Sequence, residues 1–275
     1  MGKLFDEGEL DRQIAEGRRL RQEMQRAGAA SGGFNPLSLG HWLSLCAAAR
    51  VPAVPALSLG RIAIDVIMSE DPAARAFEKT MAAQMAVFGM GWMARWDCCA
   101  MAETKWRLSK GEHQWDPALA DIFAEDMRAL DLIGDFPDTE IEGWARPWMS
   151  FAIHSGWPIE YRVFVQNDRI IGVSNYYPQR QLQDDGETKE DIRRATDMAL
   201  RLIGAQKRRL NCPRLSGFDM GLNHWTADFG RLQSGAIIFL EGGPPHASGG
   251  GAHPCCFEPG KIDGVALSAR WDCAP

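Results

Sequence analysis

The chain has 275 residues, of which 45% are hydrophobic and 24% are charged, and its formal net charge is −6. This length can bury a substantial core and form one or two domains. The negative charge argues against a broad nucleic-acid footprint, which needs basic surface, although a local basic groove remains compatible with it. No apolar run approaches the roughly 20 residues of a membrane span, so we expect neither nucleic acid nor membrane as a partner.

Two features of the chain bear on its compartment. Residues 1–22 are charged and contain no apolar core, so they do not form a signal peptide, and Asp6 stands where a myristoylation motif needs Ser or Thr. The seven cysteines are an odd number and include two adjacent pairs, Cys98-Cys99 and Cys255-Cys256. That pattern is not a secreted disulfide framework, and we expect a reduced, cytoplasmic protein.

Residues 1–50 are expected to form a helical N-terminal segment and a linker. Residues 4–28 are rich in Glu, Arg and Gln and predict a solvated helix, which could serve as an interaction arm. Residues 27–36 contain a Gly pair and a Pro and are typical of a linker. Residues 37–50 suggest a short buried helix.

Residues 51–143 are expected to form a first α+β subdomain. Residues 51–68 combine β-branched side chains with two prolines and predict an edge strand or two short strands. Asp71-Pro72 predicts the N-cap and first residue of a helix over 72–89. Residues 91–97 alternate like a strand, and Asp116-Pro117 predicts a further helix that ends near Leu132.

Residues 144–275 are expected to form a second α+β subdomain built on an antiparallel sheet. A helix is predicted over 186–209, with one apolar face and a basic C-terminal end. This order of elements predicts an α+β fold rather than a doubly wound parallel sheet. The strand-like segments are 144–153, 158–165, 169–177, 225–232 and 235–241.

The stretch TADFGRLQSGAIIFLEGGPPH, residues 226–246, places two carboxylates in an apolar hairpin. With Ser234-Gly235 as a two-residue loop, Arg231 pairs with Ile238 and Asp228 pairs with Glu241. Like charges at that separation repel, so a bound cation, a neighbouring Arg or Lys, or a proton must compensate.

Two interpretations of this carboxylate pair remain open at the level of sequence. In the first, Asp228 and Glu241 are hard oxygen ligands for Mg²⁺, which is usually shared with substrate phosphates. In the second, one acid forms an ion pair with Arg231 or Arg162, or the loop is longer and the acids never meet. A slip of one residue would put them on opposite faces.

A second hairpin is predicted over residues 158–178, with Asn167-Asp168 as its loop. The corresponding register pairs Arg162 with Val173 and Glu160 with Asn175. One face would then carry Glu160, Arg162 and Asn175. Either Glu160 pairs with Arg162, or Arg162 binds a phosphate or carboxylate ligand.

Two further segments carry candidate chemistry. Residues 91–111 contain Arg95 and Lys105, and because the chain has no Walker A or GxGxxG motif, a nucleotide's phosphates would need such side-chain cations. Residues 242–257 form a Gly-rich loop that could close over a ligand. The same loop holds four side chains of types that bind zinc, but their spacing matches no strong zinc signature, so a zinc-stabilised structural protein is a minor alternative. These side chains are His246, His253, Cys255 and Cys256.

These motifs occur in an order that resembles the ATP-grasp superfamily. The relevant pieces are Arg95, Lys105, R-P-W-M at 146–149, E-Y-R-V-F-V at 160–165, T-A-D-F at 226–229 and I-F-L-E at 238–241. The chain looks most like the divergent clade that includes a eukaryotic translation-initiation assembly factor and many uncharacterised bacterial and phage proteins. The likeness spans roughly residues 50–250 and is strongest over 144–246.

The resemblance implies that ATP is held between two α+β subdomains. Arg95 and Lys105 would contact the phosphates, and Arg162 and Lys105 would be the catalytic cations. The hinge segment Arg146, Pro147, Trp148 and Met149 would read the adenine edge through its backbone. The resemblance further implies that Glu160 and Asn175 belong to the nucleotide site and that Asp228 and Glu241 hold Mg²⁺.

The activity implied is that of an ATP- and Mg-dependent ligase, which activates a carboxylate as an acyl-phosphate for attack by an amine or similar nucleophile. The alternative is a non-catalytic ATP-binding module that assists assembly of a partner. One departure concerns the metal shell: the family pattern Glu-x-Asn reads Glu241-Gly242-Gly243 here. A backbone carbonyl, a water or His246 would have to replace the missing Asn.

Overall fold

The computed structural model describes residues 34–69, 71–88, 91–100, 133, 136, 138–177, 182–183, 185–209 and 225–243. Several expectations from the sequence lie outside these residues: the helix over 4–28, the helix that begins at Asp116-Pro117, Lys105 and the His/Cys cluster of 246–256.

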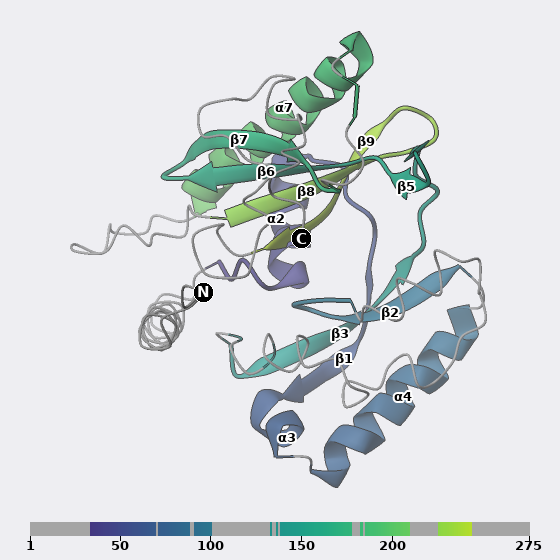
Figure 1. The fold of residues 1–275 in the computed structure, drawn as a ribbon. Coiled ribbons are helices and arrows are strands. Elements are labelled where there is room, and N and C mark those ends of the chain that lie inside the picture. The colour runs from purple at the N-terminus through teal and green to yellow at the C-terminus, as the bar shows by residue number, and fades with distance from the viewer. Residues whose placement is uncertain are drawn as a thin grey trace, which may run out of the picture.

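The described chain forms two larger antiparallel sheets with helices packed on them and a small two-stranded sheet, β4-β5, which confirms the α+β fold class (Figure 1). The first sheet has the order β1-β3-β2, and the second has the order β7-β6-β8-β9. The strands are β1 Leu57–Ala63, β2 Trp92–Trp96, β3 Glu140–Pro147, β4 Ile153–His154, β5 Trp157–Pro158, β6 Glu160–Gln166, β7 Arg169–Asn175, β8 Trp225–Arg231 and β9 Ile237–Gly243. The helices are α2 Leu39–Ala49, α3 Ile64–Met68, α4 Pro72–Phe88 and α7 Gly186–Arg209.

The first sheet is apolar on one face and carries arginines on the other. Helix α4 begins as the sequence predicts, since the Asp71 carboxylate accepts a 2.8 Å hydrogen bond from the Ala73 N–H. Its Met81 and Met85 are buried in the core on one side of the sheet. Strand register places Arg95 and Arg146 together on the other face, because Arg95 pairs with Trp144 and Arg146 with Met93.

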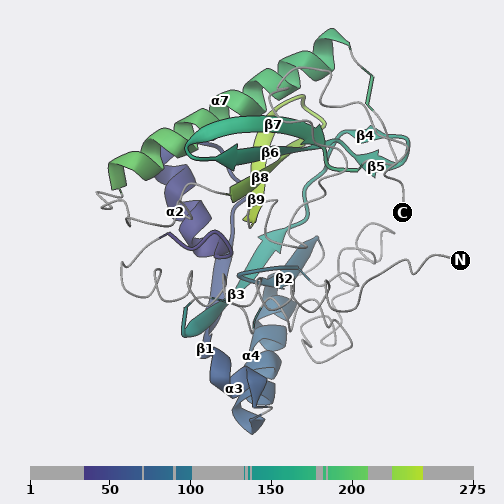
Figure 2. The same ribbon diagram turned by 60° about the vertical axis from the view of Figure 1, so that its left-hand side comes forward.

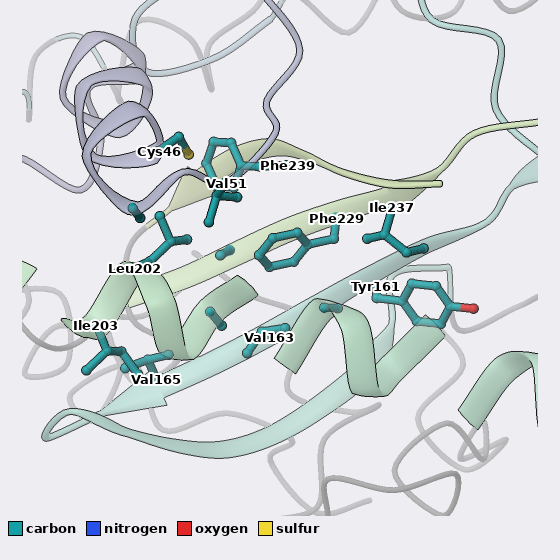
Figure 3. Close-up of a cluster of buried hydrophobic side chains, with 14 of the residues drawn as sticks. Cys46, Val51, Tyr161, Val163, Val165, Leu202, Ile203, Phe229, Ile237 and Phe239 are labelled. Carbon is teal, nitrogen blue, oxygen red and sulfur yellow. The ribbon is translucent and has the colours of Figure 1, made fainter. Parts of the chain in front are cut away.

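The second sheet also has one apolar face and one face with charged side chains. Helices α2 and α7 cover one face, where side chains from β6, β8 and β9 meet residues of both helices (Figure 3). Tyr161, Val163, Phe229 and Phe239 lie in this core and are almost completely buried. Because side chains alternate along a strand, Arg162 of β6 and Asp228 of β8 point to the other face. Glu241 of β9 pairs with Asp228 and joins them there, because an irregularity between Asp228 and Phe229 shifts the register of β9 by one residue.

The polar faces of the two sheets are in contact with each other. Arg95 of β2 reaches Glu241 of β9, so the surface that each sheet leaves uncovered by its helices faces the opposite sheet. Figure 2 shows α7 and α4 on the outer sides of the two sheets. The chain passes between the sheets through residues 50–56 and again after β3, and the first of these segments adds to the edge of β9, with the Val54 N–H donating to the Phe239 carbonyl at 3.0 Å.

Most elements follow the sequence expectations, with exceptions in residues 51–68 and in residues 144–153, where the strand instead begins at Glu140 and ends at Pro147. The edge strand is present as β1, at the edge of its sheet, but the prediction that strand continues to residue 68 is wrong, because Ile64–Met68 is the short helix α3. The β-branched composition favours a strand there. Burial of Ile67 in the core beneath α4 decides for the helix instead, so tertiary packing overrides local propensity.

The expected boundaries between subdomains lie between residues 50 and 51 and between residues 143 and 144. The boundary between residues 143 and 144 falls inside β3, which belongs to the first sheet over its whole length. Helix α2, from the expected N-terminal segment, packs on the second sheet through Trp42 and Leu45. We therefore propose residue 147 as the end of the first subdomain. No helix in the described part of the chain is long and apolar enough to cross a membrane.

Candidate functional site

The two carboxylates predicted to meet do lie opposite each other, since Asp228 pairs with Glu241 between β8 and β9. The loop that the sequence suggested is nevertheless wrong. The Leu232 carbonyl accepts from the Gly235 N–H at 2.8 Å, and Leu232 itself pairs with Ala236. Gly235 has a φ of 81°, which suits the left-handed position of a three-residue loop.

A β-bulge then restores the predicted pair. The longer loop pairs Arg231 with Ile237 rather than with Ile238. An irregularity between Asp228 and Phe229 shifts the register back by one residue, so Asp228 meets Glu241 rather than Leu240. Two one-residue errors in the sequence-based register therefore cancel at the carboxylates.

Asp228 is held within its own sheet by Arg162. The Nε of Arg162 donates to Oδ1 of Asp228 and its Nη2 donates to Oδ2, both at 2.7 Å. Both side chains are buried, and the Arg162 guanidinium lies 4.5 Å from the centroid of the Tyr176 ring. Burial lowers the pKa of Arg162, but the charge of Asp228 outweighs it, and the pKa is raised.

Glu241 is held from the opposite sheet by Arg95. Nη1 of Arg95 donates to Oε2 of Glu241 at 2.6 Å, while Nε of Arg95 donates to the Trp96 carbonyl at 3.0 Å. The Arg95 side chain is 3% exposed and that of Glu241 is 21% exposed. Burial lowers the pKa of Arg95, but the charge and hydrogen bond of Glu241 raise it above its ordinary value.

The compensation that the carboxylate pair requires therefore comes from arginines, one for each acid. The sequence named Arg162 and Arg231 as alternative partners. Arg162 takes that role, whereas Arg231 contacts Glu187 and Asp191 at the outer side of the sheet.

Arg146 is a third buried arginine on the same side of the first sheet as Arg95. Its residue surface is 5% exposed, and its Nη2 donates to the Val54 carbonyl at 3.1 Å. Within the described residues, its Nε has no hydrogen-bond partner. Burial, followed by the nearby charge of Arg95, lowers the pKa of Arg146 to about 9.

The second hairpin has the predicted loop and a different register. Asn167 and Asp168 have φ values of 51° and 62°, and Gln166 pairs with Arg169. A bulge between Phe164 and Val165 then shifts the pairing, which a residue-type pattern cannot reveal.

The predicted pairs on the far side of this bulge are wrong. Arg162 pairs with Ser174 rather than with Val173, and Asn175 pairs with Tyr161 rather than with Glu160. Asn175 therefore falls on the face opposite to Arg162. Its Nδ2 donates to the Tyr177 carbonyl at 2.6 Å, so the side chain shapes the turn after β7.

That turn brings forward an aromatic cluster that the sequence did not assign to the site. Tyr176 lies against Arg162, its ring centroid is 4.9 Å from that of Tyr177, and Tyr177 lies 4.9 Å from Trp157 of β5. Burial raises the pKa of both tyrosines, and the charges of Asp228 and Glu160 raise it further. The signal in the sequence was the Tyr-Tyr pair at 176–177, directly after Asn175 in the second predicted hairpin.

The remaining predicted residues are Glu160, the segment 147–149 and Lys105. Glu160 is buried at the start of β6, and its carbonyl accepts from the Tyr176 N–H at 2.9 Å. Pro147, Trp148 and Met149 follow Arg146 where the chain leaves β3, and the Trp148 N–H donates to the Gly91 carbonyl at 2.6 Å. Lys105 and the predicted zinc-ligand cluster lie outside the described residues.

No protein-family model and no curated protein matches this chain. Solved structures do match. The C-terminally truncated Cdc123 from Schizosaccharomyces pombe is similar over 76% of this chain and 83% of its own, with 16% identity and a TM-score of 0.43. The D-cycloserine synthetase DcsG is similar over 77% of this chain and 63% of its own, with 17% identity and a TM-score of 0.39.

A further similar structure is the N5-carboxyaminoimidazole synthase from Aspergillus clavatus in complex with ADP and 5-aminoimidazole ribonucleotide. It shares 12% identity over 78% of this chain and 46% of its own, with a TM-score of 0.37. This chain spans less than two thirds of the synthetase and of the synthase.

Proposed function

We propose that the chain binds a magnesium–ATP complex between its two sheets and uses it to activate a carboxylate for attack by an amine or similar nucleophile. One observation carries the proposal: buried arginines of both sheets converge on a pair of directly opposed carboxylates. Arg95 comes from the first sheet, and Arg162, Asp228 and Glu241 come from the second. Apolar packing alone would not gather so many charges.

The donor set fits magnesium. In the part of the chain that the structure describes, no group of three or more His, Cys, Asp or Glu side chains could enclose a metal ion. Magnesium is commonly bound by one or two carboxylates together with phosphates and waters, so Asp228 and Glu241 suffice as its protein ligands. When bound there, magnesium would neutralise charge on the phosphoryl oxygens.

The arginines have distinct parts in the proposed site. Arg162 holds both oxygens of Asp228 and so fixes the orientation of that carboxylate while it adds a positive charge. Arg95 reaches across from the other sheet and would exchange part of its contact with Glu241 for a phosphate oxygen. Lys105 remains proposed as a further phosphate contact and catalytic cation.

The other predicted residues keep supporting roles. The backbone of 146–149 is proposed to read the adenine edge where the chain crosses between the sheets. Glu160 contributes negative charge beside Tyr176 and Tyr177. Asn175 acts through the turn that it stabilises, since its side chain already bonds to the Tyr177 backbone.

The proposed reaction needs positioning and charge neutralisation rather than a protein nucleophile. An oxygen of the substrate carboxylate attacks the γ-phosphorus of ATP, the bond from that phosphorus to the β–γ bridging oxygen breaks, and ADP leaves. The amine then attacks the acyl carbon, phosphate departs with the electrons of the C–O bond, and the amine loses a proton to solvent.

The test compares Asp228→Asn with Asp197→Asn, a control on the exposed side of α7. ADP release is measured with Mg-ATP and a panel of small carboxylates and amines. We expect the wild type and the control to release ADP with one carboxylate of the panel, and Asp228→Asn to lose at least about a hundredfold of that rate, as expected when a charge-stabilising group is removed. Equal rates in both variants would disprove the proposal.

A non-catalytic ATP-binding module that assists assembly is the second candidate. Gly243 favours it, because the expected third metal ligand is absent and the Thr226 Oγ1 lies 3.1 Å from where a Cβ at residue 243 would stand. This candidate predicts ATP binding without carboxylate-dependent ADP release. A carboxylate that stimulates ADP release would reject it.

A further inference from the structure

Arg146 holds a buried positive charge that its surroundings satisfy only in part. Among the described residues, its hydrogen bond is the one from Nη2 to the Val54 carbonyl, and its Nε has none. A buried guanidinium that lacks part of its hydrogen bonding is costly, because the same donors are fully hydrated in the unfolded chain. Such a group calls for an explanation beyond packing.

The charges near Arg146 make an anion the missing partner. Arg95 and Arg146 lie on the same face of neighbouring strands, and the charge of Arg95 disfavours the protonated form of Arg146. Glu241 offsets this effect in part, but its Oε2 is engaged by Arg95 at 2.6 Å. A second anion between the two arginines would stabilise both.

The position of Arg146 explains why a ligand there would matter. Arg146 stands near the end of β3, directly before the chain crosses to the second sheet. Its partner Val54 lies in the other crossing segment, and the Val54 N–H donates to Phe239 of β9. Arg146 therefore joins the two segments that connect the sheets, beside the carboxylates of the proposed magnesium site.

A purely structural tie between the crossing segments does not account for these features. One neutral donor would satisfy the Val54 carbonyl, and it would avoid repulsion from Arg95. The backbone contact with adenine proposed for residues 146–149 does not involve the guanidinium either. Neither explanation accounts for the buried charge of Arg146 or for its Nε donor.

We infer that the guanidinium of Arg146 is a phosphate-binding group, which forms with Arg95 a two-arginine site for the polyphosphate of the ligand at the crossing of the chain. The inference rests on the proposed function for the identity of the ligand. It assigns the Arg146 side chain a role separate from the hinge backbone. The chemistry recognised is a di- or triphosphate, with or without a base.

The experiment measures the binding of inorganic tripolyphosphate to the full chain by isothermal titration calorimetry, in the absence of magnesium. The variants are Arg146→Gln and Arg146→Lys, with Arg169→Gln on the exposed end of β7 as the control. We expect the wild type and the control to bind equally and Arg146→Gln to lose about tenfold or more in affinity, the loss of one charge-assisted contact. Arg146→Lys should recover part of the affinity, since it keeps the charge and loses the planar fork.

Adenosine binding, measured on the same variants, separates the two roles of the segment. We expect it to change by less than twofold in Arg146→Lys. Tripolyphosphate affinity at the wild-type level in both Arg146 variants would overturn the inference, and so would no binding to the wild type. If Arg146→Gln does not fold, as judged by its circular dichroism and thermal transition, Arg146→Lys carries the test: a loss of less than twofold there would overturn the inference.

Failure of this inference is distinguishable from failure of the proposed function. Normal tripolyphosphate binding in the Arg146 variants, together with loss of ADP release in Asp228→Asn, would remove only the inference. Tripolyphosphate binding that depends on Arg146, without any carboxylate-dependent ADP release, would support the inference and would reject the proposed ligase activity.

Discussion

The two arginine–carboxylate pairs of the site differ in what holds them together. Arg162 and Asp228 face each other on adjacent strands of one sheet, with two 2.7 Å hydrogen bonds and both side chains buried. Arg95 and Glu241 belong to different sheets and share a contact of 2.6 Å, with Glu241 partly exposed. The first pair is a property of one sheet, whereas the second exists only while the two sheets are placed as they are here.

This difference teaches how the site could combine rigidity with adjustment. The carboxylate of Asp228 is fixed by strand register and by a bidentate partner, so it is pre-organised as a ligand. The carboxylate of Glu241 changes its surroundings whenever the sheets move relative to each other. Interfaces between such units commonly permit relative motion.

The largest effect is expected for Asp228→Ala. It leaves Arg162 buried without its charged partner, so the free energy of unfolding should fall by about 3–5 kcal/mol. Asp228→Asn keeps the shape and one acceptor and should cost clearly less, which is why it is the better variant for activity. Urea denaturation of both variants measures this, and a loss below about 1 kcal/mol in Asp228→Ala would show that the pair is not rigidly buried.

The two faces of β9 beside Glu241 provide the next comparison. A Cβ at Gly242 would stand 1.9 Å from the Trp42 ring, whereas one at Gly243 would stand 3.1 Å from the Thr226 Oγ1. Gly242→Ala should therefore lower the free energy of unfolding by about 1–3 kcal/mol through overpacking.

Gly243→Ala serves as the matched control for this comparison and should cost less than Gly242→Ala. Thermal denaturation of both variants gives the ranking. Equal losses would mean that the core between Trp42 and β9 yields easily to added volume.

A smaller effect is expected for Arg95→Gln. Glu241 is partly exposed and can recover hydration, so the free energy of unfolding should fall by about 1–2 kcal/mol. A double-mutant cycle with Glu241→Gln, set beside a cycle of Arg162→Gln and Asp228→Asn, compares the coupling energies of the two pairs. The cycle within the sheet should give the larger coupling, and the reverse order would contradict the distinction drawn between the pairs.

The smallest effect is expected on the outer face of α7. Arg193 forms ion pairs with Glu190 and Asp197 there, and all three side chains are exposed. Arg193→Gln should leave the unfolding midpoint unchanged within error, because exposed pairs are screened by water and salt. A clear loss of stability would indicate that surface ion pairs contribute more to this chain than geometry suggests.

The carboxylate hairpin shows how sequence reasoning can reach the right pair by a wrong path. Alternation and the Gln-Ser-Gly turn predicted Asp228 opposite Glu241, and the structure has that pair. The loop is one residue longer, however, and a bulge corrects the register. Neither leaves a clear mark in residue types, since bulges depend on the twist and packing of the whole sheet.

In the second hairpin, no second shift restored the register that the sequence predicted. Its turn was predicted correctly, because Asn-Asp readily takes two positive φ angles. The bulge at Phe164 and Val165 then moved Asn175 away from the face of Arg162. Short-range chemistry identified the turn, while the register beyond it was set by contacts distant in sequence.

The sequence by itself determined which side chains could do chemistry, namely the two acids and the arginines of three strands. It also determined the class of fold. Alternation and turn residues are local, so the order and type of the elements followed from them. Only the tertiary structure decided that Arg95 reaches Glu241 from the other sheet, 146 residues away. It also decided that Arg146 is buried beside Arg95 with an Nε that has no hydrogen-bond partner among the described residues, because burial and the approach of two sheets are properties of the assembled chain.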